Sequence, residues 1–359
     1  MINKKRVRAL LLAGVMTMTM VLGGSSMAAD GEGENDQITT TVQPMVTKVL
    51  EMAEGITVPD AAFSFEISSN TPDAARAQIQ DLTYSSAVEK GTPADGKYCI
   101  SKTSEIDFDS FEHAGVYEYT VTEKADTYLA QEDEVMTYSA SSYKLNVYVV
   151  NSESGPCISE ITATKDGVKV DKIEFVNTFV KNNKTLTISK STVGDYADKT
   201  KDFTFTITFT KAATAGDETS YTGTIGDTTV VCEAGVATEF SLHDGEELVF
   251  TDLPAGTRYV VTEAGAEDGY TPSVNVVENG TETVKNATVE NEKDALSSAE
   301  TGKTNLVGEC ENKADFVNTY KSVVITGIIV NVLPFVVMIA AVLLAAAGLA
   351  VVKRRRSFR

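Results

Sequence analysis

Strict alternation of large apolar residues with threonine marks the stretch Phe203-Thr204-Phe205-Thr206-Ile207-Thr208-Phe209. Successive side chains of a strand point to opposite faces, so this pattern is typical of a strand with one face in a core. Residues 143–150 are a second run rich in strand-forming residues. Short turn signals separate such runs: Asp166-Gly167, Asp244-Gly245, Pro254-Ala255-Gly256, Asp268-Gly269 and Asn279-Gly280. Short strands with frequent turns predict an all-β fold of Ig-like β-sandwiches.

An internal repeat predicts two such sandwiches. Residues 117–123 (YEYTVTE) resemble residues 257–263 (TRYVVTE), and residues 175–179 (FVNTF) resemble residues 316–320 (FVNTY). Each repeat also opens with a strand that carries one lysine, and the three matches recur at a nearly constant separation of 140–142 residues. Such a period indicates a duplicated domain. We expect the first domain at 45–181 and the second at 182–321, placed end to end by a short link.

Three polar residues interrupt the apolar face of each predicted domain. They are Lys48, Glu123 and Asn177 in the first domain and Lys190, Glu263 and Asn318 in the second. Strand ends, where a side chain reaches water, offer one explanation. Lys and Glu are almost never fully buried unless they are paired. Because the same trio recurs in both repeats, we favour a buried set whose members satisfy one another.

A buried trio of this kind can react. Desolvation lowers the pKa of a lysine and raises that of a glutamate, which leaves a neutral, nucleophilic amine beside a protonated acid. The acid can polarise the asparagine carbonyl and carry protons, while the amine attacks and ammonia leaves. The product is an amide cross-link formed once per site, which is self-modification and not enzymatic turnover.

Both termini carry export signals. Lys4, Lys5, Arg6 and Arg8 precede an apolar stretch that ends near Leu22, and small residues follow, which predicts a signal peptide over 1–28. Residues 323–352 are almost wholly apolar and are followed by Lys353 and four arginines. This length spans a bilayer, and the basic tail places the end of the chain in the cytoplasm.

The exported part is strongly acidic. It holds all 51 Asp and Glu but only 22 of the 31 Lys and Arg, and it begins with a flexible acidic segment at 29–44. Nucleic acid is therefore excluded as a partner, because phosphate binding needs a basic face. With only His113 and His243 in the chain, and no phosphate-binding loop or nucleophile motif, the sequence indicates no metal, no cofactor and no enzyme.

Four cysteines occur in a chain destined for an oxidising exterior. They are Cys99, Cys157, Cys232 and Cys310. Three connectivities exist for four cysteines. Cys99–Cys157 and Cys232–Cys310 would keep each disulfide within one domain, and we state these pairs as an expectation.

The ordered set of motifs resembles a known family. It includes residues 111–117 (FEHAGVY) before the Glu123 strand, residues 186–190 (LTISK), residues 201–205 (KDFTF), the two Phe-Val-Asn-Thr segments and the C-terminal signal. In this order they resemble the two-domain major pilins of streptococci, with isopeptide-linked (CnaB-type) sandwiches. The resemblance covers most of residues 40–356. It implies Lys48–Asn177 and Lys190–Asn318 bonds, assisted by Glu123 and Glu263.

The resemblance also implies assembly at the surface of a Gram-positive cell. A pilus sortase would cut between Thr326 and Gly327, within a sorting signal at 322–359, and join the new carboxyl terminus to a lysine of an identical subunit. Lys169 is the favoured acceptor, with Lys172 and Lys165 as alternatives. Minor pilins and peptidoglycan are further implied partners, and the C-terminal helix would hold the precursor in the membrane.

One feature departs from the family pattern. Sorting signals of this class carry proline shortly before Thr-Gly, whereas residues 323–327 read Val-Val-Ile-Thr-Gly. A specialised sortase would have to accept this variant. The alternative function is a monomeric adhesin or minor pilin anchored to wall or membrane, although no binding domain stands outside the two repeats.

Overall fold

The computed structural model describes residues 44–217 and 219–321. Within these residues the chain forms strands and loops, which confirms the all-β prediction, and it contains no helix that could cross a membrane. The predicted signal peptide, the acidic segment up to residue 43 and the sorting signal with Thr326 and Gly327 lie outside the described residues.

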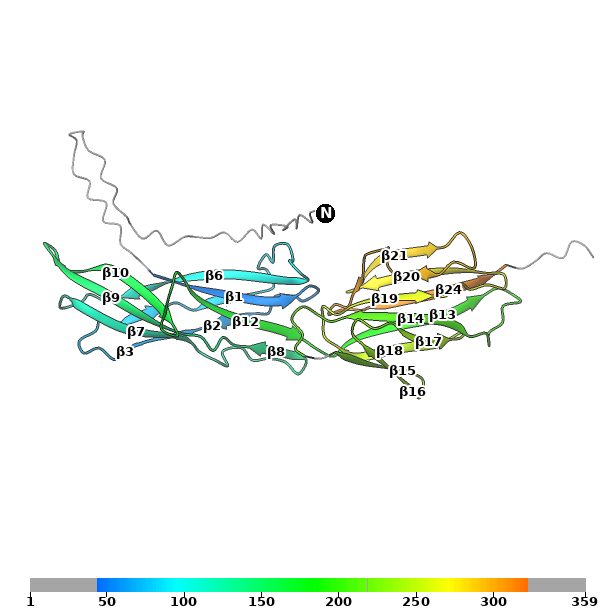
Figure 1. Cartoon of the computed structure of the whole chain (residues 1–359), viewed down its shortest axis with the longest axis horizontal. Helices are drawn as coiled ribbons and strands as arrows, with labels where there is room; N and C mark the ends of the chain where they lie inside the picture. The colour runs from blue at the N-terminus through cyan, green and yellow to red at the C-terminus, as the bar shows by residue number, and fades with distance from the viewer. Residues whose placement is uncertain (1–43, 218, 322–359) are drawn as a thin grey trace, which may run out of the picture.

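Two groups of sheets lie end to end (Figure 1). No sheet in the described part of the chain combines strands from both groups. The first group comprises β1 (Met45–Ala53), β2 (Ala61–Phe63), β3 (Phe65–Ser69), β4 (Ala77–Ile79), β5 (Leu82–Tyr84), β6 (Lys97–Phe108), β7 (Gly115–Glu123), β8 (Glu134–Thr137), β9 (Ser142–Ser152), β10 (Gly155–Lys165), β11 (Val168–Val170) and β12 (Ile173–Lys181).

The second group follows after two connecting residues. It comprises β13 (Lys184–Val193), β14 (Phe203–Thr210), β15 (Ser220–Ile225), β16 (Thr228–Glu233), β17 (Thr238–Leu242), β18 (Glu247–Leu253), β19 (Arg258–Glu263), β20 (Tyr270–Glu278), β21 (Thr281–Thr288), β22 (Leu296–Ser297), β23 (Asn305–Leu306) and β24 (Lys313–Tyr320).

Sheet order places the first and last strand of each group side by side. The main sheets of the first group run β4-β6-β1-β12-β8 and β11-β10-β9-β7-β3. Those of the second run β16-β15-β18-β13-β24-β20-β21 and β17-β14-β19-β22. Strands β1 and β12 pair in parallel, as do β13 and β24, while the other neighbours in these sheets are antiparallel. The two ends of each group are therefore joined inside its own sheet.

Aromatic side chains fill the space between the sheets. The β14 sequence buries Phe203, Phe205, Ile207 and Phe209, because every second residue faces inward. In the first group, the inward positions of β7 and β9 alternate in the same way. Each pair of sheets thus encloses its own apolar core, which removes water from any polar group that points inward.

Close contacts hold the two groups together. The Lys181 amine lies 3.1 Å from a Glu309 carboxylate oxygen, and the other oxygen of Glu309 accepts a hydrogen bond from Thr57. Arg258 forms an ion pair with Glu54. The N–H of Ala255 donates to the Lys181 carbonyl at 2.8 Å, and Ala255 packs in the apolar cluster of the first group. Polar and apolar contacts together fix this junction.

Replacement of Gly256 by alanine tests the tightness of the junction. Gly256 has a φ of +92°, and a Cβ there would lie 2.3 Å from the Ala53 Cβ across the junction. We expect Gly256→Ala to lower the free energy of unfolding by about 3 kcal/mol, since backbone strain and overpacking act together. Guanidinium denaturation followed by circular dichroism measures this change.

Gly235→Ala is the matched control. Gly235 has a φ of +80°, and among the described residues no heavy atom beyond its chain neighbours lies within 4 Å of the position that an alanine Cβ would take. In this variant only backbone strain acts, so the free energy of unfolding should fall by about 1 kcal/mol. Equal losses in the two variants would contradict close packing at the junction.

Candidate cross-linking sites

Parallel pairing of terminal strands places a lysine near an asparagine in each group. Lys48 of β1 lies opposite Phe175 of β12, so Asn177 stands two residues further along the same face. The second group repeats this register, with Lys190 opposite Phe316 and Asn318 two residues beyond. Both side chains of each pair point into the core, and all four residues are buried.

A glutamate reaches each pair from the facing sheet. Glu123 ends β7, and its Oε1 lies 3.1 Å from the Lys48 amine while accepting a hydrogen bond from the Asn177 amide nitrogen at 2.8 Å. The Lys48 amine also donates to the Phe175 carbonyl at 3.3 Å. The Glu123 side chain is fully buried. The three residues predicted for the first site therefore lie together.

The second site repeats the contacts of one glutamate oxygen with both nitrogens at shorter range. Glu263 ends β19, and its Oε1 lies 2.8 Å from the Lys190 amine. The same oxygen accepts a hydrogen bond from the Asn318 amide nitrogen at 2.7 Å. Both ionisable side chains are fully buried. The structure thus brings together the second predicted trio as well.

Aromatic rings cover the two amines. The Lys48 amine lies 4.7 Å from the centre of the Phe63 ring, and the Lys190 amine lies 4.3 Å from that of Phe203. Burial lowers the pKa of Lys48 from 10.5 to about 8 and that of Lys190 also to about 8, although the glutamates act in the opposite direction. Burial raises the pKa of Glu263. The pairs can therefore redistribute a proton and expose a nucleophilic amine.

The two sites differ at the asparagine carbonyl. In the first, Asn177 Oδ1 accepts a hydrogen bond of 2.8 Å from the backbone N–H of Ser139. In the second, Asn318 Oδ1 is buried and has no hydrogen-bond partner among the described residues, and Glu263 Oε2 is in the same condition. Sequence reasoning missed Ser139, because a backbone donor leaves no signature in residue type.

The three lysines considered as acceptors lie near the β10–β11 hairpin. Lys165 donates to the Ser141 hydroxyl at 2.8 Å, and Lys172 pairs with Glu174 at 2.5 Å. Lys169 lies on β11, an edge strand, and is exposed. Its amine contacts no polar partner within the described part of the chain. Of these three lysines, Lys169 has the freest amine.

The expected disulfides are wrong for this structure, in which all four cysteines are free. Cys99 lies on β6 and Cys157 on β10, which belong to different sheets. Cys232 is buried in the core of the second group, whereas Cys310 is exposed in the loop before β24. The expected pairs do not form because Cys99 and Cys157 lie in different sheets, while Cys232 is in the core and Cys310 is in an exposed loop.

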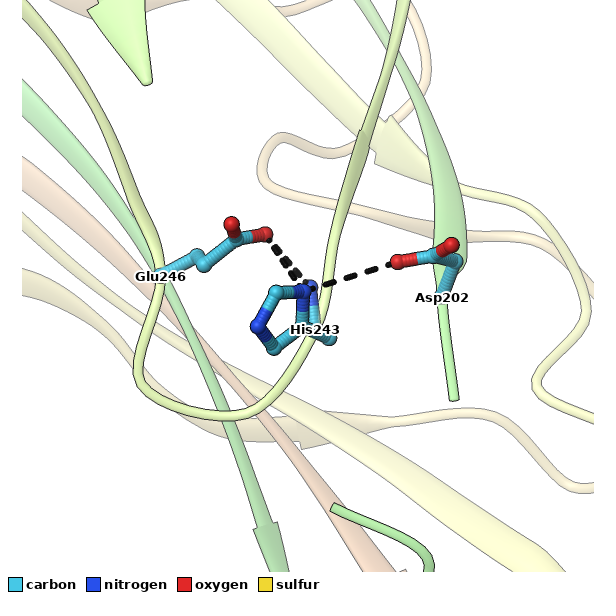
Figure 2. Close-up of side chains that lie close together, drawn as sticks. All are labelled: Asp202, His243 and Glu246. Carbon is cyan, nitrogen blue, oxygen red and sulfur yellow. Dashed lines mark hydrogen bonds and ion pairs between the residues drawn. The ribbon is translucent and has the colours of Figure 1, made fainter. Parts of the chain in front are cut away.

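A surface cluster also contains ligand-type side chains. Figure 2 shows His243 between Asp202 and Glu246, with its Nδ1 2.9 Å from a Glu246 oxygen and 3.6 Å from an Asp202 oxygen. Their three ligand atoms lie within 4.8 Å of one another, a grouping that the sequence did not reveal because Asp202 is far from the other two along the chain. Asp202 is 70% exposed, so water solvates this cluster and it needs no metal to satisfy its charges.

Comparisons with known proteins cover both groups of strands. Residues 44–180 match the family described as Spy0128-like isopeptide containing domain, and residues 184–320 match a domain of unknown function (DUF7601). A pilin of Streptococcus pyogenes serotype M1 is 32% identical over 257 residues, which are 64% of this chain and 70% of that pilin. The chain belongs to the streptococcal-type pilin family.

Two further similarities accompany this membership. The pilus tip adhesin Cpa of S. pyogenes is 43% identical over 90 residues, 25% of this pilin-family chain and 13% of the adhesin. The crystal structure of the S. pyogenes major pilin aligns with 77% of this chain and 98% of its own, at 25% identity and a TM-score of 0.36. Members of this family are structural pilus subunits with isopeptide-containing domains, and this chain is a structural subunit of a cell-surface pilus.

Asn318→Ala offers a test of the lowered lysine pKa. This variant cannot form the second bond, so Lys190 keeps its amine. Burial lowers the pKa of Lys190 to about 8 in the folded chain, against 10.5 for an exposed lysine, so we expect the unfolded state to bind more protons between these values. We expect the free energy of unfolding to rise with pH across this window, by at most about 3 kcal/mol.

The control is the double variant Lys190→Met/Asn318→Ala, which lacks the titrating amine. Guanidinium denaturation at a series of pH values measures both. The same pH slope in the two variants would show that the Lys190 pKa is not lowered by burial.

Proposed function

We propose that this pilus subunit staples each of its two sandwiches with one Lys–Asn isopeptide bond and is polymerised covalently through its C-terminus. One observation carries this proposal: a buried Lys–Glu–Asn trio occurs in both sandwiches. In each, the lysine and the asparagine lie on adjacent parallel strands, and the glutamate comes from the facing sheet. The proposed bonds are Lys48–Asn177 and Lys190–Asn318. Glu123 and Glu263 would act in their formation.

Each bond would form by attack of the lysine Nζ on the asparagine Cγ. The glutamate is hydrogen-bonded to both reacting nitrogens, so it can accept a proton from the amine and deliver it to the amide nitrogen, which leaves as ammonia. The lowered pKa of the lysine favours the neutral amine that this attack needs. The glutamate ends unchanged, and the site reacts once. The protein is therefore structural and has no turnover.

The strand order explains what such bonds would do. Force along a fibre would enter the second sandwich through β13 and leave through β24, and these two strands are neighbours in the sheet. A covalent bond between them would carry the load and leave the strands between them unloaded. Each bond would also close a loop of more than 120 residues. By analogy with a disulfide, this closure stabilises the fold by about 4–5 kcal/mol in the chain-entropy model.

Domain boundaries follow from the same geometry. We place the first stapled sandwich at 45–181 and the second at 182–321, which agrees with the separate sheets of the two groups. The signal peptide at 1–28, the acidic segment at 29–44 and the sorting signal at 322–359 are proposed from the sequence. Together they describe a precursor that is exported, held in the membrane by its C-terminal helix and then assembled at the cell surface.

Assembly would be performed by a pilus sortase. It would cleave between Thr326 and Gly327 and transfer the Thr326 carboxyl group to Lys169 of an identical subunit. The exposed, unpaired amine of Lys169 supports this choice over Lys165 and Lys172, whose amines are engaged. Minor pilins and peptidoglycan are further partners of the assembled fibre in this proposal.

A monomeric anchored adhesin or minor pilin is the second candidate. It would share the stapled sandwiches and the anchor, and the absence of proline before Thr326 gives it some support, because that departure weakens the sorting signal. Covalent multimers distinguish the two functions.

Intact mass tests the cross-links. The unaltered chain should be lighter than its sequence by two molecules of ammonia, and Lys48→Ala or Lys190→Ala should each restore one of them. Glu123→Ala and Glu263→Ala should have the same effect at their own sites, because proton transfer fails without the carboxylate. Mass spectrometry of the reduced chain, with peptide mapping, identifies the joined residues.

A mass equal to that of the sequence would contradict both bonds. Arg76→Ala, which changes a residue far from both trios in sequence, is the control and should retain the full deficit.

Lys169→Ala tests polymerisation. In cells that express the cognate sortase, the unaltered chain should give a ladder of multimers that survives boiling in detergent. Lys169→Ala should remove the ladder, because the acceptor amine is lost, while Lys165→Ala and Lys172→Ala should retain it. Immunoblots of cell-wall extracts measure the ladder. A ladder that persists in Lys169→Ala would contradict the assignment of Lys169 as the acceptor.

A further inference from the structure

The first cross-linking site holds a polar contact that the second lacks. Ser139 lies in the connection between β8 and β9, and its backbone N–H points at Asn177 Oδ1 over 2.8 Å. No comparable donor reaches Asn318 Oδ1 from the described residues. The two sites share their strand register and the contacts of one glutamate oxygen with both nitrogens, while the Lys48 amine also donates to Glu123 Oε2 and to the Phe175 carbonyl. The donor aimed at the asparagine carbonyl is the difference that bears on the oxyanion.

The Ser139 N–H fixes the orientation of the Asn177 amide. A backbone N–H can only donate, so the atom that it meets must be the carbonyl oxygen. The amide nitrogen is then turned toward Glu123 Oε1, to which it donates at 2.8 Å. Glu123 therefore faces the two nitrogens of the reaction, Lys48 Nζ and Asn177 Nδ2, and does not face the carbonyl oxygen.

The connection that carries Ser139 is held from several sides. The Tyr138 hydroxyl accepts a hydrogen bond of 2.7 Å from the Tyr128 N–H, and the Tyr138 ring packs edge-on against Phe63. Phe63 is the ring that covers the Lys48 amine. The Ser139 hydroxyl accepts a hydrogen bond from the Ser141 N–H. The segment that carries the donor thus packs against the same ring that covers the nucleophile.

Attack on an amide places negative charge on the carbonyl oxygen, and a donor already aimed at that oxygen lowers the barrier. We propose that the Ser139 backbone N–H is the oxyanion donor of the first cross-linking reaction, so that Glu123 serves there as a proton carrier only. This inference rests on the proposed Lys48–Asn177 bond.

The atoms balance with these groups alone. Lys48 Nζ forms a bond to Asn177 Cγ, and the carbonyl electron pair moves onto Oδ1, where the Ser139 N–H stabilises it. Glu123 takes one proton from Nζ and gives one to Nδ2. The Cγ–Nδ2 bond then breaks, the electron pair returns from Oδ1 to restore the carbonyl, and ammonia leaves.

The second site offers no such donor. The Asn318 amide nitrogen also donates to Glu263 Oε1, and neither Asn318 Oδ1 nor Glu263 Oε2 has a hydrogen-bond partner in the described structure. The inference therefore concerns the first reaction alone.

Ser139→Pro tests the donor, because proline lacks the backbone N–H. The full chain is made by cell-free translation with a mild detergent, samples are quenched in acidic denaturant, and peptide mapping gives the rate of each bond separately. We expect the first bond to form about a hundredfold more slowly in Ser139→Pro, the usual effect of losing one oxyanion donor. The second bond should form at its normal rate, and because it lies in the other sandwich it is an internal standard for translation and quenching.

Two control variants isolate the N–H. Ser139→Ala removes the hydroxyl and keeps the donor, and Ala140→Pro places the same ring one residue later and leaves the Ser139 N–H intact. Both should form the first bond within a few-fold of the normal rate. A normal rate in Ser139→Pro, or an equal loss in Ala140→Pro, would overturn the assignment.

A measurement on the unaltered chain covers the case in which Ser139→Pro fails to fold. In the product, the isopeptide oxygen should keep its bond to the Ser139 N–H, so this amide should exchange its hydrogen far more slowly than its neighbour at Ala140. Equal exchange at the two amides would overturn the inference. Absence of the first bond from the unaltered chain would instead contradict the proposed cross-link itself.

Discussion

Parallel pairing between the first and last strand of each sandwich is the constraint on which this pilin-family subunit depends. The register pairs Lys48 with the residue two positions before Asn177, and it pairs Lys190 with the residue two positions before Asn318. A slip of one residue in either pair would turn one partner to the opposite face of the sheet. The position of the trio follows from this one register, and the proposed closed loop depends on it.

Burial makes the two lysines that this register positions more reactive. A lysine and a glutamate placed under aromatic rings bear a desolvation cost that their mutual attraction only partly offsets. The lowered pKa of Lys48 and Lys190 expresses this cost. Conversion of the amine and the amide into a neutral isopeptide bond, with loss of ammonia, would remove the buried cation permanently. The same desolvation that would destabilise an ordinary core would thus favour the proposed cross-link.

The duplicated sites place the same trio in two different local environments. Their glutamates contact the same two nitrogens, yet only the first carbonyl meets a backbone donor among the described residues. The duplicated strands preserve side chains at matching positions, whereas the connection that contains Ser139 belongs to the first group. Loops vary more freely than the strands they join, so they are where two copies of one reaction can diverge.

Much of this arrangement is determined by the sequence alone. Alternation in Phe203–Phe209 fixes strand and face, and the repeat of lysine, glutamate and asparagine identifies the residues that point inward, because side-chain direction in a strand depends only on position. Tertiary structure decided the rest. The free cysteines, the His243 cluster, the junction at Gly256 and the Ser139 donor all depend on which loops and surfaces meet across the fold. Contacts between distant segments and backbone hydrogen bonds leave no local pattern in residue type, so the order of residues along the chain could not supply them.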